Sequence, residues 1–394
     1  MDPASVPSTA EALKGLETLL RDGPVAWATE AEPHVRTATE DSIRHFSLGT
    51  GDDNPLYTDA DYAGSSVRRG LVASPLFVLA TGLPRVVGQR LSAEVASLLV
   101  AGASIGEERW TFLRPVRPEA RLERSDTIVA LALAPHVRTQ GAQSEMIERS
   151  TWTAHGTTYA IRDRLRVHGP QRSTARRAAK ASYDDTTLNG IAAGYDAEVR
   201  RGANTRTVGE VAVGQPLDLV VRGPLTVTDL VTYRSAVGPG PLKAGALRIG
   251  HLNRRQHGRL FSKNDVGAWE TAERLHWDEA HARRVGHPTA YDYSHTRPLW
   301  LAQMLTDWIG DGGWLAHLSV SSPGMNYVGD THWLSGEVTS VAESGGDARV
   351  TLSIRAANQL GEVTCSGTAA VLLPASSGGV ADNSVVVEPD AVWR

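Results

Sequence analysis

Two short segments of this chain carry acid/base side chains at spacings that could support proton transfer. In the first, Asp52 and Tyr57 lie five residues apart in a loop rich in glycine, aspartate and proline. In the second, His276 follows two carboxylates, Glu270 and Glu273. An imidazole titrates at about 6.5, whereas an unperturbed phenol titrates at about 10 and is a weak base at neutral pH. Each segment therefore offers part of an acid/base pair.

The two segments lie in halves of the chain that repeat the same order of parts. Each half has a polar loop, then an apolar helical stretch, then several alternating strands. The apolar stretches are residues 75–83 and 298–308, and Pro298 and Gly310 suit the start and end of the second helix. Strands are expected at 109–113, 127–131 and 157–161, and again at 318–320, 332–338, 349–354 and 362–373. This order predicts a duplicated α+β unit in which a sheet wraps around a helix.

A basic and polar segment separates the halves. Residues 171–180 are rich in arginine, lysine and small side chains. This composition is typical of a solvated linker, with a binding patch for a phosphorylated ligand as the alternative. The sequence therefore predicts an N-terminal domain (1–167), a linker (168–206), a C-terminal domain (207–375) and a tail (376–394).

The first segment resembles a known motif. Residues 46–57 read Phe-Ser-Leu-Gly-Thr-Gly-Asp-Asp-Asn-Pro-Leu-Tyr, with Ala63 beyond. This run is similar to the hydratase motif of MaoC-like acyl dehydratases and (R)-specific enoyl-CoA hydratases, except that Tyr57 stands where the family has its catalytic histidine. The resemblance extends over roughly residues 41–373. It includes the segments 70–75, 110–118, 223–229, 291–293, 305–308 and 326–331.

The resemblance implies a fold and roles for individual residues of the first half. The fold would be a double hotdog, with two antiparallel sheets each wrapped around a long central helix, and a degenerate hydratase motif at residues 51–63. Asp52 matches the acid/base aspartate, and Asn54 matches the residue that braces the loop. The amide of Ser74 falls where a backbone N–H at the start of the hotdog helix binds the thioester oxygen, a position that the helix dipole favours.

The second half resembles the later part of the same motif. His276 stands at the histidine position, while Thr271 and Glu273 replace the aspartate and the asparagine. Glu270 or Glu273 could act as a substitute carboxylate for His276. Residues at the entry of the second helix are candidates for substrate binding, and Asp292 with His295 could form a carboxylate–histidine pair. These residues are Tyr291, Asp292, Tyr293, Ser294 and His295.

Three interpretations of the site stay open at this point. The site is rebuilt around His276, or it uses Asp52 and Tyr57, or the chain is not catalytic. The resemblance implies a hydro-lyase that dehydrates a 3-hydroxyacyl group or hydrates an enoyl group on coenzyme A or a carrier protein. One alternative is a repurposed hotdog enzyme of specialised metabolism that catalyses cyclisation, isomerisation or elimination on a polyketide-like substrate. The other is a non-catalytic acyl-binding subunit of a hotdog complex.

Composition limits the partners and the compartment. The chain of 394 residues is 41% hydrophobic and 21% charged, as expected of a globular protein, and its net charge of -4 favours neither nucleic acid nor membrane. The single cysteine, Cys365, lies in an expected strand and indicates a structural role in a reducing compartment. We find no secretory signal and expect a cytoplasmic location. We expect no metal or other cofactor, and either a monomer or a homodimer.

Overall fold

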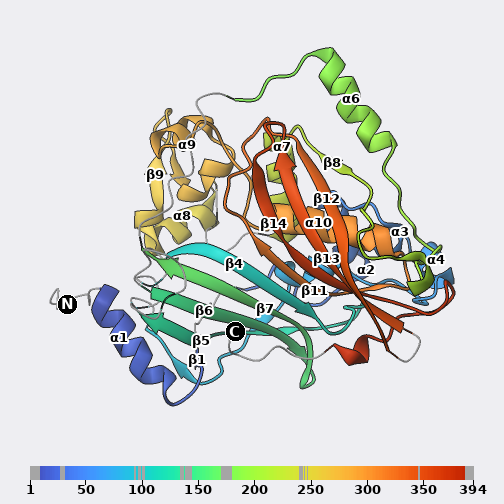
Figure 1. Ribbon diagram of the computed structural model, residues 1–394. Helices are drawn as coiled ribbons and strands as arrows, with labels where there is room; N and C mark the ends of the chain where they lie inside the picture. The colour runs from blue at the N-terminus through green and yellow to red at the C-terminus, as the bar shows by residue number, and fades with distance from the viewer. Residues whose placement is uncertain are drawn as a thin grey trace.

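The computed structural model describes residues 9–26, 32–92, 95, 99, 103–133, 137, 144–169, 180–238, 243, 245, 247–344 and 347–386. Their core is one twelve-stranded sheet that runs through both halves, in the order β3-β1-β5-β6-β7-β4-β11-β14-β13-β12-β8 with β2 on β5 (Figure 1). The first half contributes β1 (Val25–Ala26), β2 (Leu83–Pro84), β3 (Gln89–Arg90), β4 (Ala103–Phe112), β5 (Glu123–Leu133), β6 (Ser144–Ala154) and β7 (Thr157–His168). The second half contributes β8 (Val220–Arg222), β11 (Trp314–Ser321), β12 (His332–Ser344), β13 (Asp347–Asn358) and β14 (Val363–Leu373).

The two halves meet edge to edge in this sheet. Strand β4 pairs antiparallel with β11, with Glu108 opposite Val320 and Thr111 opposite His317. The strands expected from alternation fall, to within one residue at an end, in β4, β5, β7, β11, β12, β13 and β14. The α+β class is therefore confirmed, and the sheets of the two halves form one continuous sheet.

Helices cover the sheet and carry the two candidate segments. The α-helices are α1 (Thr9–Leu20), α2 (Glu40–Gly49), α3 (Pro55–Thr58), α4 (Ala60–Ser65), α6 (Asp185–Asp196), α7 (Val227–Val237), α8 (Arg248–Gln256), α9 (Glu279–Arg284) and α10 (Thr296–Ile309). The 3-10 helices are η1 (Pro75–Ala80), η2 (Val208–Glu210), η3 (Gly258–Leu260), η4 (Ala272–His276) and η5 (Asn383–Val385), and a small hairpin joins β9 (Phe261–Lys263) to β10 (Trp269–Thr271).

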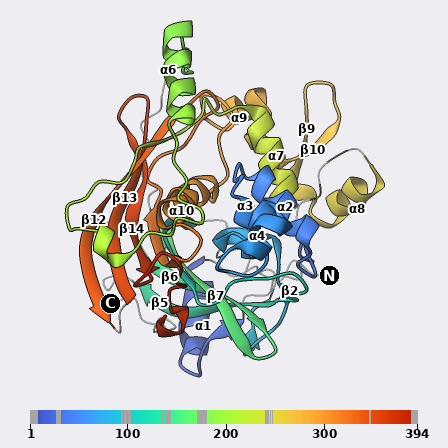
Figure 2. The ribbon, with the colours of Figure 1, turned by 90° about the vertical axis from the view of Figure 1, so that its right-hand side faces the viewer.

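Helix α10 is the central helix expected in the second half. All fourteen of its residues are buried, and Figure 2 shows it between strands β12–β14 and the blue helices α2–α4. Pro298 lies in the first turn and Gly310 ends the helix with φ 76°, because a left-handed conformation after the last turn favours glycine. The expectation from Pro298 and Gly310 is confirmed.

The first half does not contain the long helix expected at residues 75–83. A 3-10 helix of six residues, η1, stands there instead. Thr81 is extended and Gly82 has φ +101°, and the chain then pairs along β5, with Leu83 opposite Glu123. A Cβ atom at Gly82 would lie 2.6 Å from Cβ of Arg124. The 3-10 helix η1 therefore ends at Ala80, because the residues that follow it pair with β5 in the sheet.

The buried faces of the two half-sheets differ in chemistry. On β7 the side chains at alternate positions are Arg162, Arg164, Arg166 and His168, and all of them are buried. Strand β14 lies beside β11 as β7 lies beside β4, and its alternate positions carry Cys365, Ala369, Val371 and Leu373 at 2% exposure or less. Strand β7 thus places arginines where β14 places apolar side chains.

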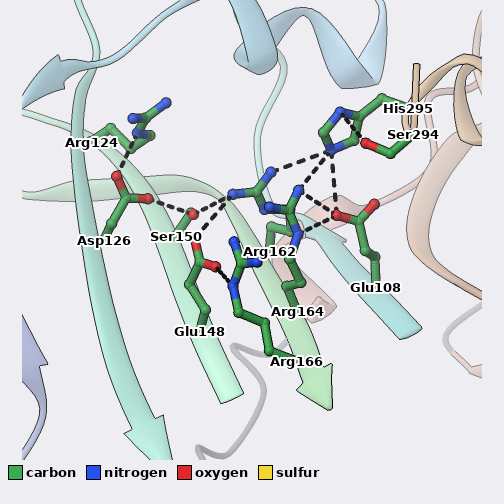
Figure 3. A network of polar contacts seen from close by, with 10 residues as sticks. All are labelled: Glu108, Arg124, Asp126, Glu148, Ser150, Arg162, Arg164, Arg166, Ser294 and His295. Carbon is green, nitrogen blue, oxygen red and sulfur yellow. Dashed lines mark hydrogen bonds and ion pairs between the residues drawn. The ribbon is translucent and has the colours of Figure 1, made fainter. Parts of the chain in front are cut away.

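Carboxylates and a hydroxyl group accept hydrogen bonds from these buried arginines (Figure 3). Arg164 Nε donates to Glu108 Oε1 at 2.6 Å, and Arg166 Nε donates to Glu148 Oε2 at 2.8 Å. Arg162 Nη2 donates to Ser150 Oγ at 2.8 Å. Buried charges are tolerated when they are paired and hydrogen-bonded in this way.

The segment predicted as a linker is partly helical. Helix α6 stands away from the sheet in both views, and residues 200–206 then pack along the end of α10 (Figures 1 and 2). Arg201 N donates to Asp307 O at 2.9 Å and Arg206 N donates to Ile309 O at 2.9 Å. The basic stretch 171–179 lies outside the described residues. No described helix has the length and apolarity needed to span a bilayer.

Candidate functional site

The hydratase-like segment (residues 46–57) forms a braced loop between α2 and α3. Gly51 has φ +80°, which turns the chain after α2. Asn54 Oδ1 accepts from Leu56 N at 3.0 Å and thereby caps α3, whose first residue is Pro55. Asp52 Oδ1 accepts from Asn54 N at 3.1 Å. The loop therefore holds the Asp52 carboxyl group in a defined, buried position.

The buried position of Asp52 brings the pKa of its carboxyl group near neutral pH. Burial, followed by the negative charge of Asp307, raises the pKa of Asp52 from 3.8 to about 7, against the hydrogen bond from the Asn54 amide. At neutral pH both protonation states of this carboxyl group are populated. That property suits a general acid or base.

The loop packs against the central helix of the other half. Gln303 Nε2 donates to Gly51 O at 3.0 Å, and Thr306 shares a hydrogen bond with the Tyr57 hydroxyl group. Gln303, Thr306 and Asp307 follow one another at the i, i+3, i+4 spacing that places side chains on one helix face. One face of α10 therefore lies against the hydratase-like segment.

Tyr57 is a hydrogen-bonding group rather than a base. It is 4% exposed. Burial raises the pKa of Tyr57 well above its usual range, and the charge of Asp52 acts in the same direction. The phenol therefore stays protonated at neutral pH.

Two cavities flank the loop. The large cavity, of about 670 Å³, lies between the loop, α7, α10 and the linker, and its lining includes Thr50, Gly51, Asp53, Arg200, Gln303 and Asp307. The small cavity, of about 40 Å³, is lined by Asn54, Tyr57 and Ser74 among others. The small cavity has room for about one water molecule, whereas the large one is of the size that holds a small-molecule ligand.

Ser74 lies where the resemblance expects it, at the start of η1. Its hydroxyl group is buried and has no hydrogen-bond partner among the described residues. It shares the small cavity with Tyr57. The structure therefore brings Tyr57, Asn54 and Ser74 together around one small space.

His276 lies at the end of η4, in contact with the other aromatic candidates. Its Nδ1–H donates to Tyr291 O at 2.8 Å, and its ring stacks on Tyr293 with centroids 3.9 Å apart. Burial lowers the pKa of His276, so the ring is neutral and its Nε2 carries a lone pair. His276 therefore has the protonation state of a base.

The two carboxylates proposed for His276 are bound to arginines. Glu273 accepts from Arg234 Nη2 at 2.9 Å and from the Tyr293 hydroxyl at 3.2 Å. Glu270 forms an ion pair with Arg274 at 3.3 Å. Within the described part of the chain, no hydrogen bond joins either carboxylate to His276. An acid/base pair at His276 would require Glu270 or Glu273 to leave these arginines.

The residues at the entry of α10 have separate partners. Asp292, 3% exposed, accepts from Arg297 Nε at 3.0 Å and from Asn326 Nδ2 at 3.2 Å. His295 instead lies beside Glu108, with its Nε2 3.3 Å from the carboxylate and 3.0 Å from Arg164 Nη2 (Figure 3). The Ser294 hydroxyl is 3.5 Å from His295 Nδ1. The carboxylate that pairs with His295 therefore comes from the first half and not from Asp292.

The functional environment contains groups that sequence reasoning missed. Asp307 and Gln303 of α10 and Arg200 of the linker line the large cavity beside the loop. A carboxylate within a helix as apolar as 298–308 was the available signal, because a buried charge is costly unless it has a function or a partner. Cys365 is buried in β14, as expected. Among the described residues, no group of three or more histidine, cysteine or acidic side chains could hold a metal ion.

Comparison with known proteins identifies the fold. A MaoC-like dehydratase superposes with a TM-score of 0.57 at 17% identity, covering 89% of this chain and 100% of that one. A MaoC domain protein of Chloroflexus aurantiacus gives 0.53 at 12% identity, with 87% and 94% covered. A double-hotdog protein of Mycobacterium tuberculosis gives 0.50 at 12% identity, with 90% and 98% covered. The chain therefore has the double-hotdog fold of MaoC-like dehydratases, as its motifs predict.

Sequence similarity to known proteins covers a smaller part of the chain than structural similarity does. A UPF0336 protein of Streptomyces coelicolor is 32% identical over 91 residues, which are 23% of this chain and 60% of that protein. A UPF0336 protein of Streptomyces avermitilis is 31% identical over the same length. The chain thus matches about three fifths of the length of these relatives. No protein-family model matches the chain.

Proposed function

We propose that the chain is a hydro-lyase that adds water to, or removes it from, an acyl thioester, and that the hydratase-like segment of the first half carries the reaction. The observation behind this proposal is the buried Asp52 carboxyl group, whose pKa is raised to about 7, in a loop that borders the large cavity. The thioester would be carried by coenzyme A or by a carrier protein. The acyl chain would occupy the large cavity.

Hydration of an enoyl thioester requires a proton for the α-carbon and a base for the attacking water. Asp52, populated in its acid form at neutral pH, can supply the proton. Tyr57 stays protonated and can donate a hydrogen bond. Ser74, at the start of η1, lines the small cavity beside Tyr57, and its hydroxyl group, which has no partner among the described residues, is suited to hold a water molecule there.

The first half is the better candidate because, within the described part of the chain, no arginine forms an ion pair with its carboxyl group. Asp52 accepts a hydrogen bond from a backbone amide, whereas Glu270 and Glu273 are held by Arg274 and Arg234. Loss of solvation raises the pKa of Asp52, and an arginine partner would oppose that rise.

The test is hydration of crotonyl-CoA and of a longer enoyl-CoA, followed by loss of the enoyl-thioester absorbance. We expect turnover by the wild type and a loss of about 100- to 10,000-fold in Asp52→Asn. Asp163→Asn is the matched control, since Asp163 is also buried but is paired with Arg149 on the opposite face of β7. This control should retain activity.

Other outcomes would redirect the proposal. Loss of activity in His276→Ala but not in Asp52→Asn would place the reaction in the second half. A wild type that binds acyl-CoA without turnover would favour an acyl-binding subunit. A wild type that is inert toward both enoyl thioesters would favour a repurposed hotdog enzyme of specialised metabolism.

A further inference from the structure

We propose that Asp307, on the central helix of the second half, is the base that works with Asp52 across the boundary between the halves. This inference rests on the proposed hydro-lyase function. In this proposal the carboxylate of Asp307 takes the role of the family's catalytic histidine, which Tyr57 replaces in this chain.

The position of Asp307 supports a role in contact with substrate. It lies one turn beyond Gln303, whose side chain donates to Gly51 O in the hydratase-like segment. Asp307 is 3% exposed, and it lines the large cavity together with Gly51 and Asp53. A ligand in that cavity would therefore touch Asp307.

The two oxygens of Asp307 have different surroundings. Its Oδ1 accepts from Arg200 Nε at 2.8 Å. Its Oδ2 is buried and has no hydrogen-bond partner among the described residues. A buried carboxylate oxygen without a donor is costly in the folded state, which points to a use in binding water or substrate.

The charges around Asp307 favour its ionised form relative to Asp52. Burial raises the pKa of Asp307 from 3.8 to about 6, and the charge and hydrogen bond of Arg200 oppose the rise. Glu198 of the linker raises this pKa, and Arg222 of β8 lowers it. From the loop, Asp52 and Asp53 face the same region. Since the pKa of Asp52 is about 7, Asp307 loses its proton first as the pH rises.

The two carboxyl groups then account for every proton in the reaction. Ionised Asp307 takes a proton from water as the water oxygen bonds to the β-carbon. The electron pair of the carbon–carbon double bond forms the new bond between the α-carbon and the proton of Asp52. Asp307 ends protonated and Asp52 ionised, and transfer of one proton from Asp307 to Asp52 restores the starting state. Two carboxyl groups with separated pKa values can divide acid and base roles in this way.

The test is the pH dependence of enoyl-CoA hydration in the wild type and in Asp307→Asn. The wild-type rate should fall below about pH 6, where Asp307 is protonated, and above about pH 7, where Asp52 loses its proton. In Asp307→Asn we expect kcat to fall about 100- to 10,000-fold. The acidic limb should disappear, and the alkaline limb should move to lower pH because the charge that raises the pKa of Asp52 is gone.

Controls separate this proposal from the proposed function. Asp163→Asn, a buried aspartate paired with an arginine elsewhere, should keep both limbs. Asp307→Glu should restore part of the activity, and this variant also serves if Asp307→Asn fails to fold. Activity lost in Asp52→Asn but retained with both limbs in Asp307→Asn would overturn the role of Asp307 and leave the hydro-lyase intact. A wild-type profile without an acidic limb would overturn it as well. Absence of any wild-type turnover would overturn both.

Discussion

The two halves share a strand order but stabilise their sheets in different ways. In the second half, α10 is buried against apolar strands, with residues such as Leu352 and Leu301 fully inaccessible. In the first half, η1 is short, and the buried face of β7 carries Arg162, Arg164 and Arg166. Duplication of a fold therefore does not require duplication of its core. An apolar helix and a network of paired charges can each fill the concave side of a hotdog sheet.

The same asymmetry applies to the candidate sites. The first-half loop places Asp52 against α10, the long helix of the other half, whereas the His276 segment binds its carboxylates to arginines. The half without a long helix thus keeps the buried carboxyl group with a raised pKa, and the half with the long helix contributes the helix against which the loop packs. Each of the following predictions tests one side of this contrast.

The largest effect is expected where a buried charge pair is broken in the first half. Glu108→Leu leaves Arg164 without the acceptor that lies 2.6 Å from its Nε, and we expect a loss of about 3–5 kcal/mol in the free energy of unfolding. The double variant Glu108→Leu with Arg164→Met should recover most of this loss, because it removes both charges. Denaturant unfolding measures both. A double variant no more stable than the single one would show that the network cannot be replaced by apolar side chains.

The two candidate acid/base groups should affect stability in opposite directions as the pH changes. Burial raises the pKa of Asp52 from 3.8 to about 7. Its contribution, up to about 4 kcal/mol, is therefore full at low pH and lost as the pH rises through this range. Burial lowers the pKa of His276, so its contribution is present above its unfolded pKa and lost as the pH falls.

Unfolding measured between about pH 4 and 8 checks this prediction. Asp52→Asn should lose less stability than the wild type as the pH rises over this interval, because the amide does not titrate. His276→Ala should lose less than the wild type as the pH falls. Parallel curves for the wild type and Asp52→Asn would mean that the carboxyl group is not desolvated in the folded protein.

A smaller effect is expected at the end of the short helix. Gly82→Ala must adopt φ +101° and bring a Cβ atom to 2.6 Å from Cβ of Arg124, and we expect a loss of about 1–3 kcal/mol. Gly156→Ala is the matched control in the same half. Gly156 also has a positive φ, but no atom lies within 4 Å of the added Cβ. The difference between the melting temperatures of the two variants therefore measures the cost of the close contact at Gly82.

The smallest effect is expected in the apolar face of the second half. Ile354→Val removes one methylene group from a side chain on β13 that is 3% exposed. We expect a loss of about 0.5–1.5 kcal/mol in the free energy of unfolding. The exposed Val363→Ala, 40% accessible, provides the surface control. An equal loss at both positions would show that the second-half core is loosely packed.

Much of the fold could be predicted because its signals are local. Alternation located most of the long strands but missed β6, and Pro298 and Gly310 bounded α10. The expected helix at 75–83 was wrong in length, because composition alone cannot show that Gly82 turns the chain onto β5. The arginines of β7 were also not recognised as buried, since alternating charged residues normally indicate an exposed face.

The sequence by itself determined the hydratase-like loop, in which Asp52, Asn54 and Pro55 make their contacts within a few residues of one another. Only the tertiary structure decided which distant groups meet there. It brings Asp307 close enough for its charge to raise the pKa of Asp52, joins Glu273 to Arg234, and pairs His295 with a carboxylate of the other half. The physical reason is the separation along the chain of the residues that interact. Turns and caps depend on neighbouring residues, whereas the pKa and the partner of a buried charge depend on all the side chains that packing brings around it.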